Sequence, residues 1–146
     1  MPDDDGHLAT TIYIASPEGD TGKSTIALGI LHRLTAMVAR VGVFRPITRV
    51  GEGRDYILEL LLAQSTAGLD YDECVGVGYQ QLHTDTDTAI ATIVDRFHAM
   101  ADRCDAVLIV GANPRTEAPL LNARLRKAWL NGKMEIGLIG EQANLT

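Results

Sequence analysis

The stretch that most constrains the fold of this chain is a phosphate-loop motif set between two apolar runs. Thr11–Ser16, "TIYIAS", has the composition of a buried strand, and the loop Pro17–Lys23 follows it. Ser24–Ala39 repeats apolar residues every three to four positions, which predicts an amphipathic helix. The recurring positions are Ile26, Ile30, Leu34 and Met37, with Ala27, Leu31 and Val38 beside them. Val41–Arg45 predicts a second strand. Strand, loop, helix and strand make a βαβ unit, so the two strands should be parallel with a right-handed crossover.

The rest of the chain continues the alternation of helices and strands. Helices are predicted over 55–65, 88–103 and 120–130, and strands over 106–110 and 135–139. One face of the 88–103 helix is lined by the apolar residues Ile90, Ile93, Val94, Phe97, Met100 and Ala101. Cys74–Val77 is a weaker candidate strand because of its neighbouring glycines. The alternation predicts one α/β domain over 1–146 with an open, mainly parallel, doubly wound sheet of the P-loop NTPase type. We expect about four strands in the order 2-3-1-4, with the strand before the phosphate loop in a central position.

The composition argues against several other functions. The net charge of −6 argues against general nucleic-acid binding, and no apolar run reaches the roughly 18 residues of a membrane span. Residues 1–10 are acidic and lack the apolar core of a secretory signal, so we expect a disordered lead and a cytoplasmic protein. Cys74 and Cys104 have no metal-ligand spacing, which predicts buried free thiols.

The segment "SPEGDTGKST", residues 16–25, carries the chemistry that phosphate binding requires. A loop at a helix N-terminus turns backbone N–H groups toward phosphate oxygens, a lysine reaches the β- and γ-phosphates, and a hydroxyl meets magnesium. Lys23 would be the cation, and the Ser24 hydroxyl would bind Mg²⁺. The predicted phosphate contacts are Gly19, Asp20, Thr21, Gly22, Lys23, Ser24 and Thr25. In the plainer alternative, Ser24 and Thr25 only cap the helix.

Two departures limit what this loop can do with a nucleotide. Pro17 stands where such loops open with glycine, and it offers no N–H and fixes φ near about −65°. No carboxylate follows Val110 to hold magnesium, since Asp105 stands at the other end of that strand. Glu18 and Asp20 are the acidic substitutes inside the loop. We therefore expect ATP or a similar nucleotide to bind with Mg²⁺, with little or no hydrolysis.

Arg45, at the end of the second predicted strand, is a further candidate phosphate contact. Ligands of open α/β sheets lie at the carboxyl ends of the strands, which places Arg45 within reach of a bound phosphate or carboxylate. A solvated arginine at the end of a strand is an equally good interpretation of the same position.

Residues 8–110 resemble a known P-loop domain. The resemblance lies in "IYIASPEGDTGKSTIALGILHRLTAMVARVGVFRPITR" and in the stretch that ends "DRCDAVLIVG". Both are similar to the N-terminal, dethiobiotin synthetase-like domain of bacterial phosphate acetyltransferase, whose relatives also lack glycine at the position of Pro17. The resemblance implies that 11–110 form a regulatory domain that senses metabolites and supports oligomerisation, without the acetyltransferase catalytic domain.

Residues 106–146 resemble a different protein. They are similar to a segment of the large iron–sulfur subunit of respiratory NADH dehydrogenase (complex I), from a molybdopterin-oxidoreductase-like domain that carries no molybdopterin there. The cluster ligands of that family lie elsewhere, so we expect no iron–sulfur cluster in this chain. The strand at 106–110 suits both families and the charge balance changes beyond it. These features predict a chimera, with 111–146 as a complex I-like helix and strand.

Two classes of function therefore compete for this sequence. The first is a regulatory domain that binds a small-molecule nucleotide, with at most weak NTPase activity and homo-oligomerisation left open. The alternative is a structural or interaction domain with a relic phosphate loop, or a fragment related to the NADH dehydrogenase subunit.

Overall fold

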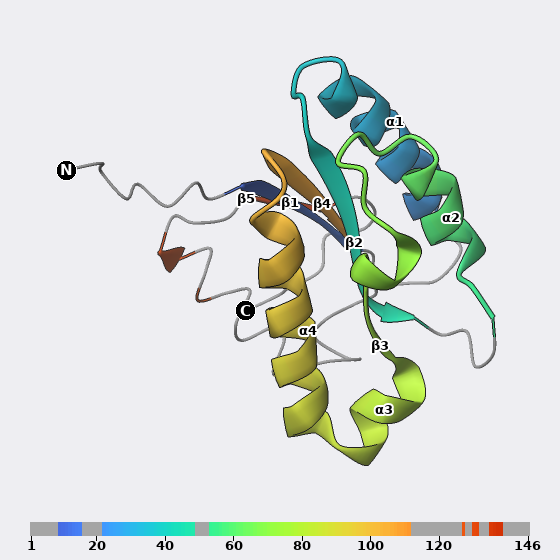
Figure 1. The fold of residues 1–146 in the computed structure, drawn as a ribbon, viewed down its shortest axis with the longest axis vertical. Helices are drawn as coiled ribbons and strands as arrows, with labels where there is room; N and C mark the ends of the chain where they lie inside the picture. Colours follow the sequence, from blue (N-terminus) through green and yellow to red (C-terminus); the bar gives the residue numbers. More distant parts are fainter. Residues whose placement is uncertain are drawn as a thin grey trace.

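The computed structural model describes residues 9–15, 22–48, 53–111, 127, 130–131 and 135–138. Within these ranges the chain forms a five-stranded parallel sheet with helices on both faces (Figure 1). The strands are β1 (Thr10–Ala15), β2 (Val41–Thr48), β3 (Val75–Gly78), β4 (Ala106–Val110) and β5 (Glu135–Leu138). The helices are α1 (Lys23–Thr35), α2 (Tyr56–Leu62), α3 (Tyr79–Thr84) and α4 (Thr86–Ala101), with a short 3₁₀ helix, η1 (Tyr71–Glu73).

The strand order is β3-β2-β4-β1-β5. The four strands that the sequence predicts most strongly follow the expected order 2-3-1-4, which is confirmed, and β3 adds a fifth strand at one edge. The glycine at position 76 had weakened the prediction of β3. In the structure a Cβ there would overlap the carbonyl oxygen of Pro46 and lie 2.9 Å from Ile93 Cγ1. Gly76 therefore permits the close approach of β3 to β2.

β2 runs three residues beyond its predicted end and includes Pro46. The Arg45 N–H donates to the Cys74 carbonyl at 2.8 Å, so the neighbouring Pro46 faces β4 instead. Pairing between β2 and β4 ends at Phe44 and Ile109. The N–H that proline lacks is thus not needed in the ladder, which explains why the strand continues through it.

The helices divide between the two faces of the sheet, and the core lies between the layers. Figure 1 shows α1 and α2 side by side on one face and α4, with α3 at its end, on the other. Right-handed crossovers require this division, because the chain moves outward from β1 to β2 and β3 and then returns to β4. β4 is buried along its whole length. On α4, the predicted core positions Ile90, Ile93 and Met100 are buried, as expected.

The core-facing stripe of α1 is shifted to Ala27 and Leu31, which the prediction placed beside the main apolar row. Ala27 and Leu31 are fully buried, whereas Ile26 and Met37 are 40% and 73% exposed. The apolar residues of this segment cover more than one helix face, so their spacing alone does not select the face that packs on the sheet. The helix also ends at Thr35, four residues before its predicted end.

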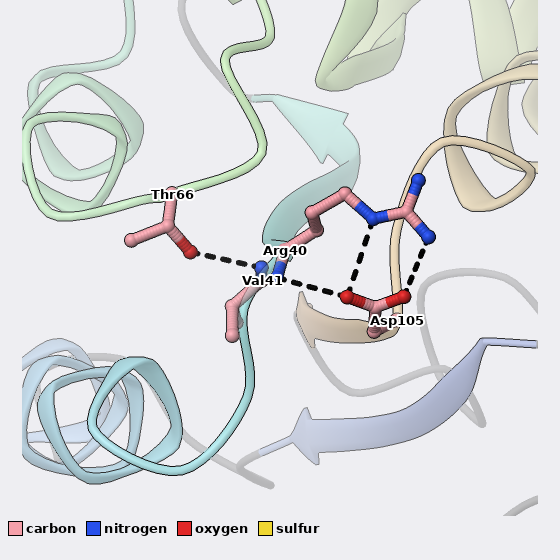
Figure 2. Close-up of polar contacts among 4 residues, drawn as sticks. All are labelled: Arg40, Val41, Thr66 and Asp105. Atoms are coloured by element: carbon pink, nitrogen blue, oxygen red, sulfur yellow. Dashed lines mark hydrogen bonds and ion pairs between the residues drawn. The ribbon is translucent and has the colours of Figure 1, made fainter.

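A bidentate ion pair joins β2 and β4 at the amino edge of the sheet. Asp105 Oδ2 accepts from the Arg40 backbone N–H at 3.0 Å and from Arg40 Nε at 3.2 Å, and Oδ1 accepts from Arg40 Nη2 at 2.6 Å (Figure 2). Beside it, the Val41 N–H donates to Thr66 Oγ1 at 3.0 Å. Asp105, which stands at the wrong end of its strand to hold magnesium, therefore joins β4 to β2 at the edge opposite to the phosphate motif.

Some predictions fall outside the described residues. They are residues 1–8 of the predicted lead over 1–10, residues 17–21 of the predicted loop Pro17–Lys23 and nearly all of the helix predicted over 120–130. β5 begins at its predicted residue, Glu135. In the part of the chain that the structure describes, no helix combines the length and apolar character needed to cross a membrane.

Candidate functional site

The carboxyl edge of the sheet has the topology of a ligand site. The chain leaves β1 through α1 and reaches β2, which lies on one side of β1. It leaves β4 and reaches β5, which lies on the other side of β1. The direction of the connections therefore reverses between β1 and β4. These two strands pair from Thr10 and Ala106 to Ile14 and Val110. Open parallel sheets bind ligands in front of such a switch point.

The N-terminus of α1 opens on this edge. Gly22, its N-cap, has φ 74° and offers no side chain, and a Cβ built there would meet nothing within 4 Å. Its carbonyl accepts from Ile26 N–H at 3.2 Å, so the helix is regular from its start. The first turn holds Lys23, Ser24 and Thr25 and no acidic residue. A first turn that begins at a glycine, has positive partial charge and carries a lysine favours an anion.

Arg45 lies in a buried ion pair with Asp55. Arg45 Nε is 2.5 Å from Asp55 Oδ2, and their side chains are only 20% and 7% exposed. The N–H of Nε is not aligned with this contact, so Nε forms no hydrogen bond. Asp55 also caps α2, because its Oδ1 accepts from Ile57 N–H at 2.9 Å and from Leu58 N–H at 3.3 Å. The pair therefore ties the start of α2 to the middle of the sheet.

Two residues near this edge were not singled out from the sequence. Asp55 was predicted only as a helix start, although an aspartate before the apolar run "YILELLL" is a capping signal. Tyr13 is buried in β1, and its hydroxyl lies against Gly111, the first residue after β4. Only the pairing of β1 with β4 brings Tyr13 to the switch point, so no sequence signal could have found it.

The structure describes only some of the residues that were predicted to contact phosphate. Gly22, Lys23, Ser24 and Thr25 form the first turn of α1, and Arg45 is held by Asp55 two strands away from β1. Gly19, Asp20 and Thr21 lie outside the described residues. The structure thus brings the second half of the motif to the switch point.

The cysteines are unsuited to metal binding. Cys74 and Cys104 are both buried, as predicted, and neither forms a disulfide. Burial raises the pKa of Cys74 to about 12 and also raises the pKa of Cys104, so both are neutral thiols near pH 7, whereas metals bind the thiolate. Across the described residues, no group of three histidine, cysteine or acidic side chains could hold a metal ion.

Comparison with known families corrects the identity inferred from the sequence. A family model described as molybdopterin oxidoreductase matches residues 71–146. The match begins about forty residues before the expected junction and continues across β4, so the predicted chimera near residue 110 was wrong. The resemblances to phosphate acetyltransferase and to the complex I subunit are likewise overturned as identifications.

The predicted function and cofactors are corrected with the identity. A regulatory P-loop domain that binds ATP and magnesium was the wrong interpretation, because the matched family is an oxidoreductase family. The physical reason is that a strand, a glycine-containing turn and a basic helix start suit any phosphate group. Gly-Lys-Ser-Thr therefore does not by itself distinguish a nucleotide from another phosphate-bearing ligand.

The family implies a molybdenum–pterin cofactor, and the residues of this chain fit one part of it. Neutral buried thiols and the absence of a metal-ligand group among the described residues do not fit the metal. Two cysteines also fall short of the four thiolates of an iron–sulfur cluster. The phosphate of the organic part does fit the first turn of α1, which begins at Gly22 and holds Lys23. Because the family match covers more than half of the 146 residues, this chain belongs to the molybdopterin oxidoreductase family.

Proposed function

We propose that this chain serves an oxidoreductase of its family by binding the phosphate-bearing, organic part of the pterin cofactor at the carboxyl edge of the sheet. The observation that carries the proposal is the glycine-led, basic N-terminus of α1 beside the β1–β4 switch point, in a chain of this family. The cofactor, when bound, supplies the redox chemistry through its metal.

The role of each residue follows from its position in the first turn of α1. Gly22 has a left-handed conformation that other residues adopt only with strain, and it leaves open space for an approaching phosphate oxygen. The first backbone N–H groups of an α-helix lack intrahelical acceptors, which is why a helix N-terminus can bind an anion. The Lys23 ammonium adds a full charge, and the Ser24 and Thr25 hydroxyls add donors.

The same geometry explains why a magnesium ion is not required. A monoester phosphate or a pyrophosphate carries less charge than a nucleoside triphosphate, and helix N-termini bind such groups through N–H donors alone. The lack of an acidic residue in the first turn of α1 agrees with a ligand that is itself the anion. The helix start and Lys23 would hold the cofactor, and catalysis would depend on groups beyond those described.

The test is the pterin content of the purified chain. The chain would be expressed in a host that makes the cofactor, and bound pterin would be oxidised to its fluorescent form and quantified per mole of protein. We expect the parent to carry pterin and Lys23→Ala to carry about tenfold less, since one charge-assisted contact to phosphate is lost. Arg33→Ala is the matched control, because Arg33 is exposed in the last turn of the same helix.

Two results would contradict the proposal. One is a parent chain without pterin from a host that loads other enzymes of this family. The other is an equal loss of pterin in Lys23→Ala and Arg33→Ala, which would show that binding depends on overall charge and not on the N-terminus of α1.

A further inference from the structure

The register of the sheet places Arg45 at the carboxyl edge, although it lies within β2. Phe44 pairs with Ile109, and Ile109 pairs with Tyr13. One residue further on, Arg45 is therefore level with Val110 and Ile14, the last pair between β4 and β1. Beyond Arg45, β2 continues for three residues past the end of its pairing with β4, and there Ile47 and Thr48 pair with β3.

The side chain of Arg45 lies on the face of the sheet that α1 and α2 cover. Phe44 packs against Phe97 of α4, with ring centroids 5.6 Å apart, so it points to the opposite face. Neighbouring residues of a strand alternate between faces, which turns Arg45 toward α1 and α2. Of these two helices, α2 begins beside Arg45, because its N-cap Asp55 contacts the guanidinium.

Asp55 holds the Nε side of the Arg45 guanidinium. The Asp55 carboxylate is fixed by the two N–H groups of the α2 cap, and the Asp55 N–H itself donates to Tyr71 Oη at 2.6 Å. Contact with this carboxylate anchors the Nε side of the guanidinium. Among the described residues, neither Nη group of Arg45 donates a hydrogen bond. The fork of Nη donors is thus pre-positioned and, as far as the described residues go, donates to no other group.

We propose that Arg45, positioned by Asp55, binds an oxyanion of a phosphate group in the ligand at the carboxyl edge. The inference rests on the proposed function and adds a second contact, one that comes from β2 instead of α1. Two parallel Nη donors match two oxygens of one phosphate, and a lysine cannot reproduce this geometry. Because the arginine is held before the ligand arrives, little side-chain entropy is lost on binding.

Calorimetric titration of the full chain with inorganic pyrophosphate at low ionic strength tests the proposal. We expect Arg45→Lys to weaken pyrophosphate binding about tenfold, because the variant keeps the charge beside Asp55 but loses the fork. Arg54→Lys is the matched control, since Arg54 is exposed, lies beside the same helix start and stacks on Tyr71. It should change binding less than twofold. Thermal melts of both variants confirm that each is folded.

The possible results separate this inference from the proposed function. If the parent binds pyrophosphate and Arg45→Lys binds it equally well, Arg45 serves only the fold and the inference is overturned, while the role of α1 stands. If the parent binds neither pterin nor pyrophosphate, the proposed function fails as well. A parallel titration with malonate compares the two kinds of oxyanion. If malonate binds as tightly as pyrophosphate and its binding also depends on Arg45, the site recognises carboxylates as well as phosphates, and the assignment to phosphate is overturned.

Discussion

Replacing Asp55 with alanine tests the arrangement that ties α2 to the sheet. The Asp55 side chain is 7% exposed and contacts Arg45 Nε at 2.5 Å, and it also caps α2 through two N–H groups. Loss of a helix cap costs about 1 kcal/mol. Breaking a buried ion pair costs about 3–5 kcal/mol, which we reduce to about 2 because Arg45 keeps 20% exposure and can rehydrate. The expected loss in the free energy of unfolding is therefore about 3 kcal/mol.

Urea denaturation followed by circular dichroism measures this loss. In a thermal melt of a chain this long, 3 kcal/mol corresponds to a midpoint lower by about 9 °C. Asp85→Ala is the control, because Asp85 caps α4 through one N–H at 3.2 Å in an exposed position. It should lose about 1 kcal/mol. Asp55→Asn keeps an acceptor for the cap and should lose about 2 kcal/mol, the share assigned to the ion pair.

Equal, small losses for Asp55→Ala and Asp85→Ala would refute the reasoning. Such a result would mean that the contact between Arg45 and Asp55 contributes nothing to stability. Arg45 would then not be held in place before a ligand binds, and the argument for its pre-positioning would lose its support.

Two further predictions concern β3 and the buried thiols. Gly76→Ala should destabilise the fold by about 2–3 kcal/mol in urea denaturation, because its Cβ would overlap the backbone of Pro46. The control Gly29→Ala, at an exposed position of α1, should stabilise the fold by up to about 1 kcal/mol. Equal effects of the two substitutions would contradict the packing of β3 against β2. Burial raises the pKa of Cys74 from 9.0 to about 12, so the thiol ionises first in the unfolded chain. The stability that this thiol contributes is present below pH 9 and is lost between pH 9 and 12. Urea midpoints across this range should fall more for the parent than for Cys74→Ala, and parallel curves would contradict the prediction.

The sequence by itself determined the fold class and much of the topology. Alternating apolar runs and amphipathic segments predicted a parallel α/β sheet, and the order of the four strongest strands was right. The core face of α4 was also right, because Ile90, Ile93 and Met100 recur with the period of one helix face. Such patterns are local, so they can be recognised without knowing what packs against them.

Other features depended on contacts that only the tertiary structure contains. β3 was weakly predicted because the close approach that explains Gly76 involves β2, which lies about thirty residues earlier in the chain. The same dependence applies to Arg45, whose level in the sheet follows from the register of β2, β4 and β1. Its partner Asp55 was readable as a cap but not as the residue that holds an arginine.

The ligand was the least accessible feature from sequence. Gly-Lys-Ser-Thr after a strand predicts a helix N-terminus with a lysine at the carboxyl edge, and Gly22 to Thr25 form the start of α1. It does not state which phosphate-bearing molecule binds, because helix N–H groups recognise phosphate oxygens and not the rest of a ligand. The sequence therefore determined the elements and their alternation, which depend on local periodicity. Only the tertiary structure decided which side chains share the edge, because strand pairing and register join residues far apart in the chain.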